Sequence, residues 1–155
     1  MNALVLAAAN PFDLRAWLLA PHAQHPVIVH FPIALFIMSA VFEVLALWRK
    51  QPAFASVAYF NLLGAAISIP FTIATGLAAW QWQLEGVTLK GNLRLHLVFA
   101  LTTATIILFL FWRRYRLRTN GRSPRTGYFA LMAIGLLMIT LTGHLGGILS
   151  GVEGP

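Results

Sequence analysis

The sequence predicts an all-α membrane protein, a bundle of four transmembrane helices with a short N-terminal interfacial segment. Hydrophobic residues make up 59% of the 155-residue chain and charged residues only 10%, and the mean hydropathy is +0.76. Soluble domains carry about 25% charged residues, so this composition favours lipid as the solvent. The apolar residues also fall into four runs separated by short links, each run close to or above the roughly 20 residues that cross a bilayer core.

These runs place the helices within one transmembrane domain, residues 25–155. Glu43 is the only acid in the first run, and the second has no charged residue. The second run is longer than a crossing needs, so we expect tilt and a kink at Pro70. The third lies between Arg94 and Arg113, and the fourth is uncharged apart from any proton on its single histidine. The expected helices are about 26–48, 54–82, 95–112 and 127–149.

Residues 1–24 form the N-terminal segment. Leu4–Ala9 is apolar, but no basic residue precedes it and the stretch is short, so we expect no signal-peptide cleavage. Leu14–Ala20 is expected to lie along the outer membrane surface, with Trp17 among the lipid headgroups.

Lysine and arginine are distributed unequally between the two sides of the bundle. Eight lie in the first and third links between helices, whereas three lie in the N-terminal segment and the second link. The positive-inside rule therefore predicts a multi-pass protein of the bacterial inner membrane with both termini periplasmic. It also explains the basic run Arg113–Arg125 as a solvated cytoplasmic loop, so we expect no nucleic-acid partner.

Four histidines are predicted to lie at one depth in the membrane. His25 and His30 open the first helix, His96 opens the third, and His144 precedes the end of the fourth, so all four fall near the periplasmic face. Ionisable residues at membrane depth indicate a functional site. Imidazoles that face one another across a bundle can hold a b-type haem, which needs no cysteine, whereas the absence of cysteine excludes covalent c-type haem.

The neighbours of these histidines favour a bound macrocycle. Gly143 and Gly147 flank His144, and their missing side chains allow a flat group to approach the backbone. Arg94 lies close to His96 on the outer side and can neutralise a haem propionate. We therefore count these two glycines and this arginine among the cofactor-binding residues.

The start of the first helix is predicted to be irregular. Pro32 lacks an N–H group and leaves the carbonyl of Ile28 without its helical donor. Such irregular backbone would bring His25 and His30 inward together, although their spacing of five is wrong for one helix face. The strongest ligand candidates for haem or a metal ion are His30, His96 and His144, with His25 next.

Other uses of the same residues stay open. The histidines also suit a copper- or zinc-binding transport protein, because imidazole binds both metals, or a structural subunit in which they only form hydrogen bonds. Glu43 and Asn61 lie at similar depth toward the other face and suggest a quinone or proton site, unless Glu43 pairs with Arg49 or Lys50. No nucleophile or paired carboxylates accompany the histidines, so we expect no catalysis by the chain alone.

Two motifs carry a family resemblance. The chain reads HPVIVHFPIAL at 25–35 and TGHLGG at 142–147. Over residues 22–152 it resembles a bacterial family of four-helix membrane proteins, domain of unknown function 2231, whose characteristic histidines are matched by His25, His30 and His144 and whose pattern His96 also fits. Members are sometimes joined to, or encoded with, electron-transfer modules such as Rieske or cytochrome c domains. The resemblance implies redox service, with a periplasmic electron carrier or a larger respiratory complex as a separate partner.

Overall fold

The computed structural model describes residues 21–150, and every regular element in this range is a helix. The helices are α2 (Pro21–Ile28), α3 (His30–Arg49), α4 (Pro52–Gln83), α5 (Gly91–Thr119) and α6 (Thr126–Leu149). Four segments are long and apolar enough to cross a membrane: Gln24–Arg49, Pro52–Trp82, Gly91–Thr119 and Thr126–Leu149. The predicted fold class is therefore confirmed, while the expectations for residues 1–20 and for both termini lie outside the described residues.

Proline and left-handed residues set the helix boundaries. Lys50 ends α3 in the left-handed conformation with φ of 52°, and its N–H bonds the Ala46 carbonyl. Pro52 then opens α4, where its fixed φ suits the first helical position. Glu85 and Gly86 both have positive φ in the link after α4, which turns the chain back toward α5.

The start of the first membrane segment keeps helical backbone angles, so the expected irregularity is limited to one missing hydrogen bond. Val29, between α2 and α3, has φ of −61° and ψ of −27°, and its N–H bonds the His25 carbonyl at 3.0 Å. Pro32 lies at the third position of α3 and cannot donate to the Ile28 carbonyl, which accounts for the boundary between α2 and α3.

The third helix is longer than predicted. It runs to Thr119, seven residues beyond the expected end at 112, because arginine is a good helix former once the helix has left the apolar layer. The expectation of a loop over 113–125 is therefore wrong for its first half. Only residues 120–125 form the link to α6, with Gly121 at φ of 62°.

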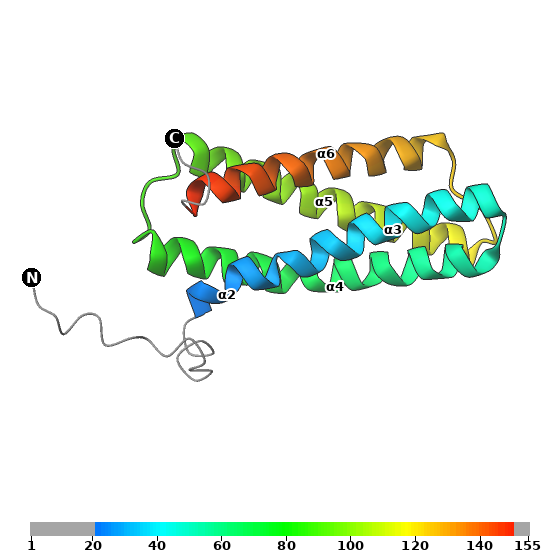
Figure 1. The fold of residues 1–155 in the computed structure, drawn as a ribbon, viewed down its shortest axis with the longest axis horizontal. Coiled ribbons are helices and arrows are strands. Elements are labelled where there is room, and N and C mark those ends of the chain that lie inside the picture. Colours follow the sequence, from blue (N-terminus) through cyan, green and yellow to red (C-terminus); the bar gives the residue numbers. More distant parts are fainter. Residues whose placement is uncertain (1–20, 151–155) are drawn as a thin grey trace, which may run out of the picture.

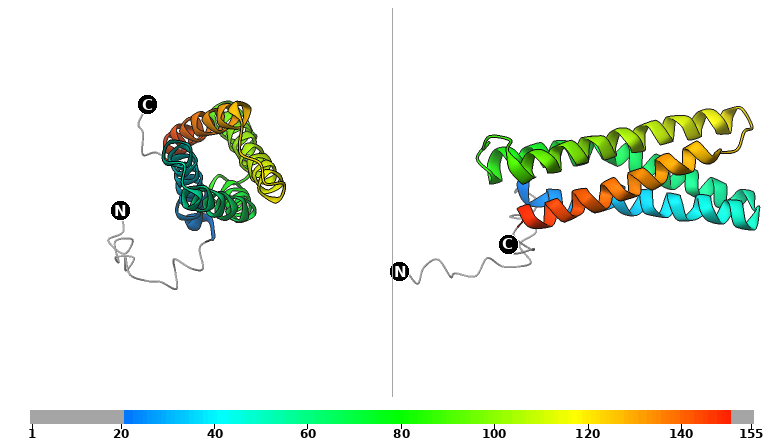
Figure 2. Two further views of the ribbon diagram at one scale, coloured as in Figure 1. Left: turned by 90° about the vertical axis from the view of Figure 1, so that its right-hand side faces the viewer. Right: turned by 90° about the horizontal axis from the view of Figure 1, so that it is seen from above.

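The helices form two antiparallel pairs (Figure 1). α3 packs along α4 and α5 along α6, α2 lies on α4, and contacts of α4 with α5 and of α3 with α6 join the pairs. Viewed end-on, the long helices surround a common axis (Figure 2). The start of α3, the end of α4, the start of α5 and the end of α6 therefore share one end of the bundle.

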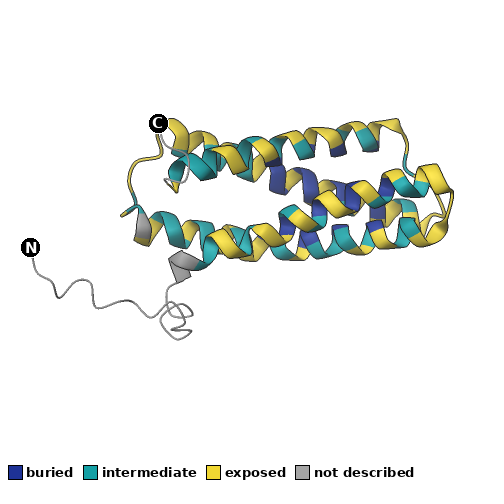
Figure 3. Ribbon diagram, in the orientation of Figure 1, coloured by how far each residue is buried: buried dark blue, intermediate teal, exposed yellow. Residues whose placement is uncertain are grey.

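The core occupies only one half of the bundle (Figure 3). Buried side chains fall within 32–43 of α3, 58–69 of α4, 103–114 of α5 and 128–139 of α6. In the other half, which we call the histidine end, side chains are at most half-buried; it comprises residues 24–31, 70–82, 91–102 and 140–149. The two helix pairs thus meet closely at one end only.

Candidate cofactor site

His25 lies on α2 and packs against α4. Its ring is half-buried, and its Nδ1 lies 3.1 Å from the hydroxyl oxygen of Thr75. A Cβ atom built on Gly76 would lie 3.1 Å from Cε1 of the same ring, so a side chain at this position would crowd the imidazole. α4 therefore holds this histidine in one place.

His96 lies on α5 and packs against α6 in the same manner. Its ring is half-buried, and its Nδ1 lies 3.0 Å from the Thr142 carbonyl oxygen. A Cβ atom built on Gly146 would lie 3.3 Å from Cε1 of this ring. Each histidine thus reaches across to the neighbouring helix of its own pair, where a threonine oxygen orients it and a glycine admits it.

His25 and His96 lie at the same end of the bundle but on different helix pairs. His25 belongs to the α2–α4 side and His96 to the α5–α6 side, and each ring contacts the neighbouring helix of its own side. Both lie at the histidine end, where the pairs are joined by no buried side chain. They are the two predicted ligands that are half-buried rather than exposed.

The hydrogen bond of His96 selects its tautomer, because the Thr142 carbonyl can only accept and therefore takes the proton of Nδ1–H. The lone pair of the neutral His96 ring is then on Nε2, which is the arrangement of a histidine that ligates a metal while Nδ1–H is held by an oxygen. The Thr75 hydroxyl can both donate and accept, so its contact fixes the place of the His25 ring and is compatible with either tautomer.

The other predicted ligands lie on the outside of the bundle. His30 is exposed, and its Nδ1 hydrogen-bonds the Pro26 carbonyl one turn back in its own chain segment. The expected inward placement of His25 and His30 together is therefore wrong, since only His25 points inward. His144 is also exposed. Within residues 21–150, no three histidine, aspartate or glutamate residues form a group that could hold a metal ion.

The predicted glycines and arginine lie around this site rather than in it. Gly143 is exposed and a Cβ there would meet nothing within 4 Å, whereas Gly147 is half-buried. Arg94 is exposed, two residues before His96. The residues that sequence reasoning missed are the histidines' partners on α4 and α6. On α4 the available signal was the adjacent Thr75 and Gly76, whereas on α6 the contacts come from the Thr142 carbonyl and from Gly146.

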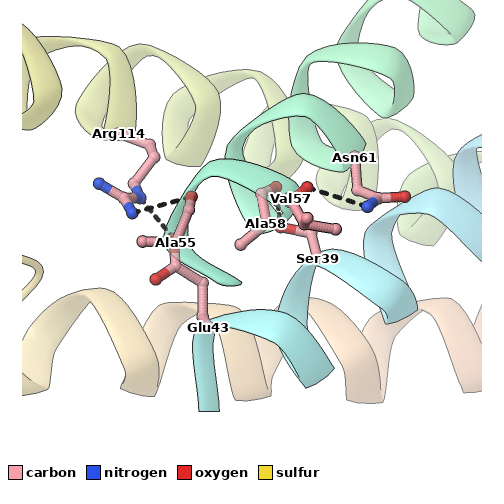
Figure 4. Close-up of polar contacts among 7 residues, drawn as sticks. All are labelled: Ser39, Glu43, Ala55, Val57, Ala58, Asn61 and Arg114. Atoms are coloured by element: carbon pink, nitrogen blue, oxygen red, sulfur yellow. Dashed lines mark hydrogen bonds and ion pairs between the residues drawn. The ribbon is translucent and has the colours of Figure 1, made fainter. Parts of the chain in front are cut away.

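A second polar cluster lies in the core at the far end (Figure 4). Glu43 and Arg114 form a buried ion pair through Arg114 Nε, and Arg114 Nη2 donates to the Ala55 carbonyl at 3.3 Å. The Tyr128 hydroxyl lies within electrostatic reach of both charges but makes no hydrogen bond of regular geometry. The expected pairing of Glu43 with the first link is wrong, because the longer α5 carries Arg114 to it.

Asn61 does not join this cluster. Its side-chain amide donates to the Val57 carbonyl of its own helix at 2.9 Å, as Figure 4 shows. Glu43 and Asn61 therefore hydrogen-bond to different partners, and no quinone or proton site built from the two of them follows from these contacts.

Comparison with known proteins gives one family match. The family described as "Predicted membrane protein (DUF2231)" matches residues 21–154, a range that includes every described helix. No curated protein and no solved structure is detectably similar to the chain.

Proposed function

The chain belongs to the DUF2231 family of predicted membrane proteins, and on that premise we propose that it is a b-type cytochrome-like electron-transfer subunit that binds haem b through His25 and His96. The observation that carries the proposal is that two half-buried imidazoles from opposite helix pairs lie at one end of the bundle, each with Nδ1 hydrogen-bonded to an oxygen of a neighbouring helix. The proposal replaces the order of ligands drawn from the sequence, in which His30, His96 and His144 came first.

The donor set fits haem better than it fits zinc. Haem b needs two axial imidazoles and no cysteine, and this donor set is compatible with the two half-buried histidines at one end of the bundle. A structural zinc ion takes four protein ligands and a catalytic one takes three, whereas no three-residue group is found in residues 21–150.

The chain's own residues would bind and orient the cofactor and regulate its surroundings. A haem supplies reversible one-electron transfer when bound. The Thr75 and Thr142 oxygens hold the two imidazoles in place, and such hydrogen bonds at Nδ1 tune the basicity of a ligating histidine. Exposed Arg94 remains a candidate for holding a propionate. The buried core in the other half of the bundle would keep water from reaching the site through the interior.

Partners follow from the expected orientation. If the arginine-rich links face the cytoplasm, the histidine end faces the periplasm. Electrons would then pass to or from a periplasmic carrier or a larger respiratory complex, since the described helices contain no second redox module.

The first prediction concerns haem content. Protein purified from haem-replete cells is expected to show a Soret band and a pyridine-haemochrome spectrum with one haem per chain. His25→Ala and His96→Ala should each lose most of this haem, because one remaining axial imidazole holds it poorly. His30→Ala is the matched control, since it removes an exposed ring five residues from His25, and it should retain wild-type haem content.

Three outcomes would contradict the proposal. The first is a colourless, folded wild-type protein. The second is a purified wild-type protein that contains copper or zinc and no iron. The third is equal haem loss in His30→Ala and His96→Ala, which would indicate a general effect of substitution at this end.

The second prediction concerns the residue that positions His25. Thr75→Val keeps the shape of the side chain but removes the oxygen that hydrogen-bonds Nδ1 of His25. Loss of such a partner costs about 10- to 100-fold in metal affinity, so haem should transfer correspondingly faster to apomyoglobin. Thr102→Val is the control, because the Thr102 hydroxyl bonds only within its own helix. An unchanged transfer rate and an unchanged midpoint potential in Thr75→Val would exclude a positioning role.

A further inference from the structure

A large cavity lies at the end of the molecule opposite the histidines. It has a volume of about 990 Å³ and is bounded by the last turns of α5, the link to α6 and the first turns of α6. Four arginines line it: Arg113, Arg116, Arg122 and Arg125. Two of them come from the α5 helix and two from the link, so the arginines surround the cavity from more than one element.

Within residues 21–150, none of these four arginines forms an ion pair with a carboxylate or stacks on an aromatic ring. Of the six arginines between 113 and 125, Arg114 is paired with Glu43 in the core. Arg118 stacks over the ring of Tyr59, with its guanidinium carbon 4.6 Å from the ring centroid. Among residues 21–150 the only other carboxylate is Glu85, which lies in the α4–α5 link at the histidine end. The cavity therefore carries uncompensated positive charge, which favours an anionic occupant.

The remaining lining is apolar on the membrane side. Phe109, Trp112 and Leu131 line the cavity where it adjoins the helices, and the first two are exposed. A charged rim above an exposed apolar wall matches a molecule with an anionic head and hydrocarbon tails. A free anion would use the rim but would leave the apolar wall unpaired.

We infer that this cavity binds one anionic phospholipid, with the headgroup phosphate among the four arginines and an acyl chain along Phe109 and Trp112. Basic pockets between transmembrane helices are sites where anionic lipid headgroups bind. The site is independent of the haem proposal, because it shares no residue with it.

Lipid titration of the delipidated full chain tests this inference. The measurement is binding of phosphatidylglycerol, phosphatidylcholine or inorganic phosphate in detergent, followed by native mass spectrometry. The wild type should bind one phosphatidylglycerol in preference to phosphatidylcholine. The double substitution Arg116→Gln, Arg122→Gln should weaken phosphatidylglycerol binding roughly 30-fold, since each basic residue near the headgroup contributes about one factor of five.

The matched control removes two positive charges from the other link at the same end. Arg49→Gln with Lys50→Gln should leave phosphatidylglycerol binding within about twofold of wild type. If the first double variant fails to fold, Arg113→Gln with Arg125→Gln provides a second pair. Equal weakening in the control pair, equal binding of the two lipids, or full competition by inorganic phosphate would each overturn the inference.

Discussion

Replacing Arg114 with methionine is expected to lower the free energy of unfolding by about 3–5 kcal/mol. Glu43 is only 2% exposed and loses its ionic partner in this variant. The carboxylate cannot move to water from that depth, and the nearby Tyr128 hydroxyl is a single weak substitute for a guanidinium. The measurement is denaturant unfolding in detergent micelles, followed by circular dichroism.

The double variant separates the cost of an unpaired charge from the value of the pair. Glu43→Leu with Arg114→Met removes both charges, and it should recover most of the stability that Arg114→Met loses, because a buried ion pair contributes little net stability. Arg49→Met is the matched control at an exposed site on the same end, with an expected change within about 0.5 kcal/mol. A single Arg114→Met variant within 1 kcal/mol of wild type would show that the ion pair is not buried as described.

Gly135→Leu is expected to have the second large effect, a destabilisation of about 3 kcal/mol or more. Even a Cβ atom at this position would lie 3.0 Å from side-chain atoms of both Ile106 and Phe36. These atoms belong to two different helices, and Phe36 is fully buried. Small residues at such contacts let transmembrane helices approach closely. A leucine side chain at this position would therefore push α6 away from α5 and α3.

Gly143→Leu is the control for this prediction. It lies eight residues further along the same helix, and a Cβ there would meet nothing within 4 Å. Its free energy of unfolding should stay within about 0.5 kcal/mol of wild type. The same variant should keep its haem, which distinguishes Gly143 from the glycines that contact the histidine rings. Similar losses in both glycine variants would mean that α6 does not tolerate leucine generally.

Hydropathy and length were sufficient to predict the four membrane helices. Histidines apart, Glu43 is the only acidic or basic residue within the four apolar runs, and the structure places a candidate span on each run. The helix ends were harder to predict, because an apolar run stops at the first arginine whereas the helix can continue beyond it. This is why the end of α5, and with it the partner of Glu43, was missed: Arg114 lies beyond the apolar run but within the helix.

The candidate site was only partly predictable, because sequence position indicates depth better than direction. His25 and His30 share a depth, but five residues on a regular helix turn the side chain by about 140°. One ring then faces the bundle and the other faces outward. Which of the two points inward depends on α4, where Gly76 leaves space and Thr75 offers an oxygen. No pattern within the first helix contains that information.

The central claim is that His25 and His96, from opposite helix pairs, hold one metal centre between them. Electron paramagnetic resonance of the oxidised, purified protein tests it most directly, because the spectrum of ferric haem reports its axial ligands. We expect a low-spin signal typical of two imidazoles in the wild type, replaced by a high-spin signal or by none in His96→Ala and in His25→Ala. A low-spin signal that survives the combined substitution of both histidines, or a wild-type protein with no haem signal, would contradict the account.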